Sequence, residues 1–294
     1  MKKIILGILL SFSILLGCTN DNAFVKHDVA ISSDSERIAY NVYGTGKTSL
    51  IFIHGWSCDS RYWKNQTSVF SKDYQVITVD LAGHGNSSSN RIDYTMLSFA
   101  KDIKAVIDRE KINRAILIGH SMGGGVIAKA SQLMPKEIIS IIGIDTFQNV
   151  SEKLPQKALD EMIKPFENNF VNAAQSFVLT MFPKETDKEL IRWIKEDMSS
   201  APKSIALSAF SNYLGQYVNS EATQVFESIT DPVVSINARL WPTNPEDNRK
   251  LIKNYKLFYI EETGHFPMME RPKEFNKLLN EALKHIKAKN NKDI

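Results

Sequence analysis

Cysteine, net charge and metal-ligand patterns are all scarce in this chain. Its 294 residues include two cysteines, Cys18 and Cys58, and carry a formal net charge of +3 at pH 7. No histidine or cysteine pair has the spacing of a metal site, and we expect neither a metal nor another cofactor. Outside the tail at 284–292 the cations form no stripe, and that tail is typical of a solvated helix end followed by a frayed terminus. The charge pattern therefore gives no support to nucleic-acid binding.

Long apolar runs are also missing, apart from one at the N-terminus. Residues 4–16 are nearly all apolar and follow a basic start, Met1-Lys2-Lys3. This run is too short to span a bilayer and has the length of a signal-peptide core. Its end, Leu15-Leu16-Gly17-Cys18, resembles the lipobox of bacterial lipoproteins. The resemblance implies cleavage before Cys18 and a diacylglycerol on its sulfur.

The resemblance divides the N-terminal region into a signal peptide, residues 1–17, and a tether, residues 18–26. It implies a protein of the bacterial cell envelope that is anchored to a membrane through the lipid on Cys18. Cys58 then has no partner, and the mature chain has no disulfide and depends on its hydrophobic core. The remaining length suffices for one large domain with an insertion.

Strand and helix patterns alternate along the chain. Several strand patterns are apolar almost throughout, as in a parallel sheet buried on both faces, and Phe99, Ile103, Val106 and Ile107 have helical spacing. This alternation predicts an α/β fold with a mostly parallel, eight-stranded sheet flanked by helices. The expected strands are 27–32, 37–43, 49–54, 75–80, 115–119, 138–145, 232–237 and 256–260.

The alternation is interrupted between residues 147 and 226. This stretch has no strand-like run, and it is helical in pattern, rich in aromatic residues and divided by prolines. We interpret it as a helical cap inserted into a core formed by residues 27–146 and 227–294. Most of its aromatic side chains are expected to pack internally, and a few to face the site.

A phosphate-binding loop is absent where the glycines are densest. Residues 123–125 are all glycine, but the chain has no G-x-x-x-x-G-K-[ST] and no G-x-G-x-x-G from Gly119. The stretch Gly119-His120-Ser121-Met122-Gly123 instead stands between an apolar run and a helix-compatible run. This G-x-S-x-G context is typical of a nucleophile elbow, in which a strained turn exposes the serine hydroxyl. The two outer glycines remove Cβ atoms where the backbone passes close to neighbouring chain.

A serine nucleophile needs a base and an oxyanion hole. His265 and His285 are the histidines that follow Ser121, and His285 lies among lysines on the predicted last helix. His265 lies in a loop after the last predicted strand, which can reach over the carboxyl ends of the strands. The oxyanion donors are expected to be the backbone N–H groups of Met122 and Trp56.

Four segments together resemble the landmark motifs of the α/β-hydrolase superfamily. They are His54-Gly55-Trp56, Asp80-x-x-Gly83-His84-Gly85-x-Ser87, the elbow at 119–123 and Gly264-His265-Phe266-Pro267. They occur in the family's order, and the match covers about residues 27–287. Haloalkane dehalogenases and epoxide hydrolases in this superfamily have an aspartate at the elbow, so Ser121 argues against both.

The catalytic acid departs from the family pattern. The usual segment after the cap here ends in Trp241, where the aspartate is expected, and an indole cannot accept the proton of a histidine nitrogen. Some members carry the acid one strand earlier, and that position is Asp145, which closes an apolar strand. A carboxylate there is costly unless it is paired. Asp145 is therefore the expected acid, with Asp247 and Glu246 as the other possibilities.

The resemblance implies a serine hydrolase that cleaves a small carboxylic ester or a related acyl compound through an acyl-enzyme on Ser121. An aminopeptidase of the prolyl-iminopeptidase kind is a second possibility, and it would need cap carboxylates such as Glu161, Glu167 and Glu196 to hold the substrate amine. A cofactor-free perhydrolase is a third. A non-catalytic ligand sensor on a hydrolase scaffold is the alternative of a different class.

Overall fold

The computed structural model describes residues 24–290, whose centre is a single sheet of eight strands. The strand order is β1-β2-β4-β3-β5-β6-β7-β8. The β1–β2 and β2–β4 pairs are antiparallel, and every other pair is parallel. The predicted mostly parallel sheet is thereby confirmed. The strands are β1 (Phe24–Ile31), β2 (Arg37–Tyr43), β3 (Ser49–Ile53), β4 (Gln75–Val79), β5 (Ala115–His120), β6 (Ile138–Ile144), β7 (Val233–Asn237) and β8 (Tyr255–Tyr259).

The first strand begins earlier than predicted. Residues 24–26 were assigned to a tether, but they belong to β1, where Phe24 and Lys26 pair with β2. The reason lies in contacts with distant residues: the Phe24 ring packs edge-on against Tyr43 at 5.6 Å, and Lys26 pairs with Glu110 at 2.7 Å. The predicted signal peptide, Cys18 and the rest of the predicted tether lie outside the described residues.

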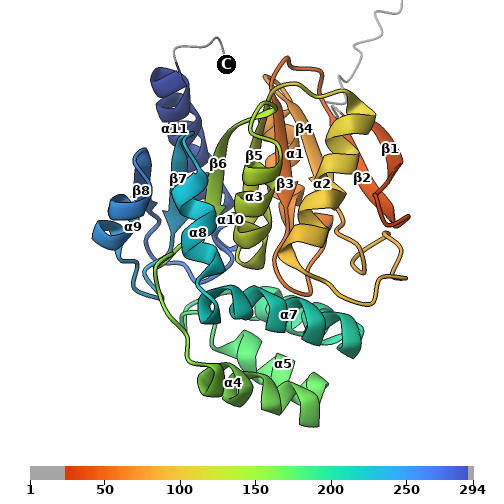
Figure 1. Cartoon of the computed structure of the whole chain (residues 1–294), viewed down its shortest axis with the longest axis vertical. Helices are drawn as coiled ribbons and strands as arrows, with labels where there is room; N and C mark the ends of the chain where they lie inside the picture. The colour runs from red at the N-terminus through yellow and green to blue at the C-terminus, as the bar shows by residue number, and fades with distance from the viewer. Residues whose placement is uncertain (1–23, 291–294) are drawn as a thin grey trace, which may run out of the picture.

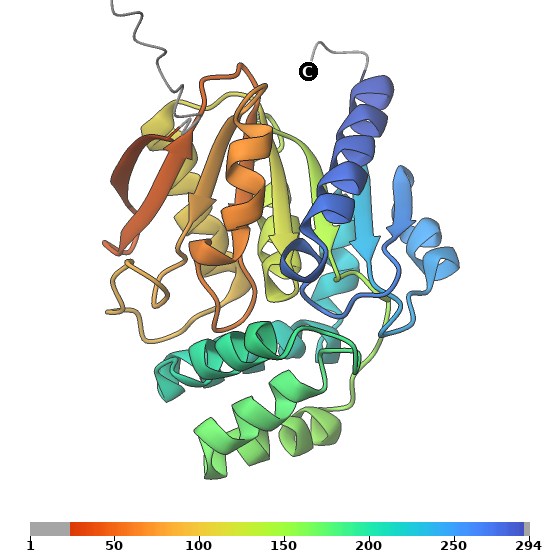
Figure 2. The ribbon, with the colours of Figure 1, turned by 180° about the vertical axis from the view of Figure 1, so that it is seen from behind.

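Helices cover both faces of the sheet (Figures 1 and 2). One face carries α2 (Met96–Glu110), α3 (Met122–Leu133) and α8 (Glu221–Ser228), and the other carries α1 (Lys64–Phe70) and α11 (Pro272–Asn290). The short helices η1 (Ser60–Trp63), α9 (Pro245–Leu251) and α10 (Pro267–Glu270) lie in the connections.

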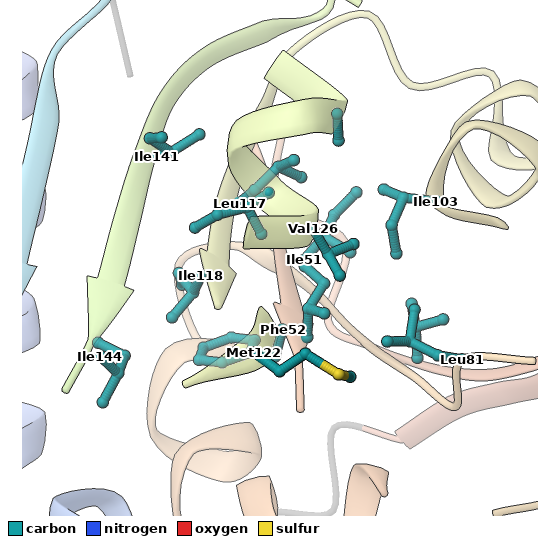
Figure 3. Packing of buried hydrophobic residues seen from close by; sticks show 14 of the residues in the cluster. Ile51, Phe52, Leu81, Ile103, Leu117, Ile118, Met122, Val126, Ile141 and Ile144 are labelled. Atoms are coloured by element: carbon teal, nitrogen blue, oxygen red, sulfur yellow. The ribbon is translucent and has the colours of Figure 1, made fainter. Parts of the chain in front are cut away.

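The core lies between these layers. Every residue of β3, β5 and β6 is buried, which explains their uninterrupted apolar pattern. Figure 3 shows Ile51 and Leu117 of the sheet next to Val126 of α3. Each such side chain contributes about 1.5–3 kcal/mol when it is fully buried. The central strands and α3 therefore form a firm base for the loops at the carboxyl edge of the sheet.

A layer of helices lies over that edge (Figure 1). It consists of α4 (Gln156–Asn168), α5 (Phe170–Leu179), α6 (Lys188–Ser199) and α7 (Lys203–Val218), and no strand occurs in the described stretch 147–226. The next helix, α8, returns to the core, where Phe226 packs edge-on against Phe147 at 4.8 Å. Trp56 joins cap to core, because four cap phenylalanines surround its ring: Phe166, Phe170, Phe177 and Phe210.

No helix within residues 24–290 is both long and apolar enough to cross a membrane.

Candidate active site

Ser121 lies in a sharp turn between β5 and α3. Its backbone has a φ of 53° and a ψ of −119°, a conformation that L-residues rarely adopt and that costs about 1–3 kcal/mol. A Cβ on Gly119 would lie 2.4 Å from the Gly123 carbonyl oxygen, and one on Gly123 would lie 2.6 Å from the His54 carbonyl oxygen. Both positions therefore require glycine, which is the steric reason given for the motif.

The turn is held by backbone hydrogen bonds from both sides. The Ser121 N–H donates to the Ile144 carbonyl of β6 at 3.1 Å. The Gly124 N–H of α3 donates to the Ser121 carbonyl at 2.8 Å. The strained residue is thus fixed between a buried strand and the first turn of a buried helix.

His265 and Asp145 lie together at the carboxyl edge of the sheet. The His265 Nδ1 is 2.6 Å from the Asp145 Oδ2, and the Ala238 N–H donates to Asp145 Oδ1 at 2.9 Å. Asp145 follows β6 directly and is 1% exposed. Each oxygen of this buried carboxylate thus has a hydrogen-bond partner, which offsets the cost of burying the group.

The other two predicted acids lie elsewhere. Asp247 and Glu246 form the first turn of α9, where Asp247 bonds to Asn244 and Lys250. Trp241 contacts His265 edge-on, with ring centroids 4.8 Å apart. The indole therefore packs against the imidazole from the segment that usually supplies the carboxylate, while Asp145 supplies the hydrogen bond.

The loop that carries His265 is held by contacts with distant segments and with a carboxylate close to it in the sequence. The His265 N–H donates to the Met181 carbonyl of the cap at 2.8 Å, and the His120 Nε2 lies 2.7 Å from the His265 carbonyl oxygen. The Glu270 carboxylate accepts hydrogen bonds from the Gly264 and Phe266 N–H groups, each at 3.0 Å.

No sequence motif predicted a role for Glu270 or Met181. Glu270 stands five residues after His265 and ends the short helix α10, so its side chain reaches back to the start of its own loop. The short distance in sequence between Glu270 and His265 was the feature from which this contact could have been predicted. Met181 accepts its hydrogen bond through the backbone carbonyl, and a backbone contact cannot be predicted from the type of side chain.

The segments that carry the expected oxyanion donors lie next to Ser121. A Cβ on Gly55 would lie 3.2 Å from the Ser121 Cβ, so the chain leading into Trp56 passes directly beside the serine. Met122 is the first residue of α3, where amides have no partner within the helix. Among the hydrogen bonds of residues 24–290, none is donated by the Trp56 or Met122 backbone amide.

The remaining histidines near the elbow are buried and support its surroundings. The His54 ring contacts the Gly55 carbonyl at 2.8 Å through Nδ1 and accepts the Leu81 N–H at 3.1 Å through Nε2. Burial lowers the pKa of His54 and of His120, and lowers that of His84 to about 3. These rings are neutral near pH 7.

An apolar cavity of about 150 Å³ contains the site. Burial raises the pKa of the Cys58 thiol in its wall, which keeps that sulfur from ionising. No cluster of His, Cys, Asp and Glu in the described part of the chain could hold a metal ion. The lining residues are Trp56, Cys58, His120, Ser121, Met122, Asp145, Gln148, Met162, Phe177, Met181, Met198, Phe210, Tyr213, Leu214, Trp241, His265 and Phe266.

Comparison with known proteins agrees with this architecture. The profile of the α/β hydrolase fold family matches residues 48–272, and this chain belongs to that family. Its sequence is similar to the pimeloyl-[acyl-carrier protein] methyl ester esterase of Wigglesworthia glossinidia brevipalpis, with 24% identity over 258 residues, which is 83% of this chain and 97% of that protein.

Solved structures share the fold. An esterase from Exiguobacterium antarcticum superimposes with a TM-score of 0.77 and 19% identity, over 88% of this chain and 100% of that one. A bromoperoxidase from Bacillus anthracis gives a TM-score of 0.76 and 21% identity, over 88% of this chain and 100% of that one.

Proposed function

We propose that this protein is a serine hydrolase that cleaves small carboxylic esters. Ser121 attacks the ester carbonyl carbon, and His265 takes the hydroxyl proton and returns it to the departing alcohol. Asp145 orients His265, and the Trp56 and Met122 N–H groups bind the oxyanion. Water then attacks the acyl-enzyme by the same route in reverse and releases the acid.

The observation that carries this proposal is the pairing of His265 with Asp145 in the cavity that Ser121 also lines. The carboxylate fixes the imidazole so that Nδ1 carries a proton and Nε2 is left as the base. The similarity to known esterases favours ester cleavage over other acyl chemistry.

The three carboxylates expected to serve an aminopeptidase do not line the cavity. Such an enzyme needs a carboxylate to hold the substrate amine, and Glu161, Glu167 and Glu196 are absent from the lining. The one acidic residue in that lining is Asp145, which already bonds to His265 and Ala238.

A fluorophosphonate probe tests the proposal directly, because it reacts with an activated serine. We expect the wild-type protein to be labelled and to hydrolyse p-nitrophenyl butyrate, and Ser121→Ala to do neither. Absence of labelling in a folded wild-type protein would favour the ligand-sensor alternative, and equal labelling of Ser121→Ala would place the nucleophile elsewhere.

We also propose that the chain is carried as a lipoprotein in the bacterial cell envelope, with its lipid on Cys18. The lipobox-like sequence before Cys18 supports this. Mass spectrometry of the native protein should find a diacylglyceryl cysteine as its first residue, and an unmodified Cys18 or a retained Met1 would contradict it.

A further inference from the structure

The site has a part lined mostly by buried residues, here called the closed cavity, and a part lined by half-buried and exposed residues, here called the open groove. The closed part is the 150 Å³ cavity, whose inner wall is formed by Trp56, Phe177, Met198 and Phe210. The open part is a second hollow of about 290 Å³ with no buried residue in its lining, and it adjoins the cavity at the four residues that line both: Gln148, Met162, Tyr213 and Leu214.

The two parts differ in chemistry. The open groove adds polar groups, namely Asn149, Glu152 and Tyr217, to the shared residues. Glu152 is exposed, and no lysine or arginine is among the described residues that line the groove. The closed cavity has mostly apolar walls, and its one carboxylate is already paired. A negative charge is therefore disfavoured in both parts, by burial in one and by Glu152 in the other.

The volume of the cavity limits what it can hold. An apolar cavity of about 150 Å³ in another protein binds benzene, a molecule of six heavy atoms. A chain much longer than about six heavy atoms would have to displace Met198 or Phe177 or leave the cavity.

The order of events decides which part of an ester lies where. When the C–O bond to the alcohol breaks, the alcohol takes the proton from His265 and has to leave, while the acyl group stays bound to Ser121 until water cleaves that bond. The part that leaves needs the open groove, and the part that stays can be enclosed.

We propose that the substrates are esters of a short, uncharged acyl group of about six heavy atoms or fewer, which lies in the closed cavity, and of an uncharged or cationic alcohol, which lies in the groove. This rests on the proposed ester hydrolysis. It defines the substrate class by size and by charge, and each property has its own test.

The size limit is tested with p-nitrophenyl esters from acetate to dodecanoate. We expect kcat/KM of the full-length protein to peak at or below hexanoate and to fall at least tenfold by decanoate. Met198→Ala should move the peak to longer chains, because Met198 is in the cavity wall and 2% exposed. Met134→Ala is the matched control, since Met134 is 3% exposed and absent from the lining.

The charge preference is tested with two thioesters that differ in the leaving group. We expect butyrylthiocholine to be cleaved at least fivefold faster, in kcat/KM, than S-butyryl-3-mercaptopropionate at low ionic strength. Glu152→Lys should bring this ratio to one or below, whereas Glu281→Lys, an equal charge change on the distant helix α11, should leave it unchanged.

Separate outcomes distinguish the two proposals. Rates that keep rising to dodecanoate, or equal rates for the two thioesters, in an enzyme whose Ser121 is labelled would overturn the substrate class alone. Failure to label Ser121 and to cleave any ester would overturn the proposed function. A Met198→Ala protein is informative if it is labelled normally, and a peak unmoved in that protein contradicts the size limit.

Discussion

The elbow at Ser121 and the loop at His265 form two sides of one site but are held in different ways. The elbow is fixed by close backbone approaches within the core, at Gly119 and Gly123. The His265 loop is held by hydrogen bonds from separate elements, including Glu270 and the cap residue Met181. Both sides have a glycine where a Cβ would clash, because a Cβ on Gly264 would also lie 2.2 Å from the Met181 carbonyl oxygen. The two sides differ in that the loop also depends on a side-chain carboxylate, that of Glu270, whereas backbone contacts hold the elbow.

The largest expected effect on activity comes from replacing the carboxylate that orients His265. Asp145→Asn should lower kcat/KM by about 10⁴-fold, because the amide no longer selects the right imidazole tautomer. Asp247→Asn should be close to wild type, since Asp247 bonds to Asn244 and Lys250. Ester hydrolysis by the two folded variants is the measurement, and the reverse result would transfer the acid role to Asp247.

On the elbow side, Gly119→Ala should lower the free energy of unfolding by about 3 kcal/mol, because the new methyl group meets a backbone oxygen at 2.4 Å. Urea denaturation measures this. A loss below about 1 kcal/mol, which is typical of unremarkable substitutions, would mean that the turn adjusts and is not sterically fixed.

A substitution that weakens the hydrogen bonds of the His265 loop should lower the activity less. Glu270→Gln removes the charge that accepts two backbone N–H groups, so the His265 loop should be less well placed and kcat should fall about tenfold with KM little changed. Glu274→Gln, which affects an exposed residue of α11, is the control. A change in KM alone would mean that Glu270 shapes binding and does not position His265.

The neutral histidines beneath the elbow predict loss of stability in acid. Burial lowers the pKa of His84 to about 3, whereas an unfolded imidazole takes up a proton near pH 6.5. As the pH falls from about 6.5 towards 3, the unfolded state binds more protons, and the free energy of unfolding falls by up to about 1.4 kcal/mol per pH unit for each such histidine.

Urea unfolding at pH 7.5, 6 and 5 measures this slope. His84→Gln should make it shallower by close to one proton, and His27→Gln on the exposed side of β1 is the control. An unchanged slope in His84→Gln would show that His84 is protonated in the folded protein.

The smallest effect contrasts a cap glycine with the elbow glycines. Gly215 lies inside α7, and a Cβ there would meet nothing within 4 Å. Gly215→Ala should therefore raise the free energy of unfolding by about 0.5–1 kcal/mol, because alanine loses less backbone entropy in a helix. The midpoint of thermal unfolding measures this. A lower midpoint in Gly215→Ala would mean that the cap glycine, like the elbow glycines, cannot be replaced without loss of stability.

The difference between local sequence patterns and contacts of distant segments explains what could be predicted from the sequence. The eight strands and the elbow were predictable, because apolar runs and glycine spacing are local properties of the chain. Asp145 could be proposed, since a carboxylate that closes a buried strand needs a partner. The start of β1 was misplaced by three residues, because its pairing with β2 depends on Tyr43 and Glu110. The cavity walls and the contact of Met181 with His265 could not be predicted, because they join segments that only the folded cap brings together.

The direction of β1 has a practical consequence. Through β2 it runs parallel to β4, so Phe24 begins at the amino edge of the sheet, while the cap covers the carboxyl edge (Figure 1). The end of α11 points the same way as that amino edge. A bead, fluorophore or fusion partner attached ahead of Phe24 would therefore be joined to the domain at the side remote from the substrate groove, and an immobilised enzyme built this way should keep its entrance free.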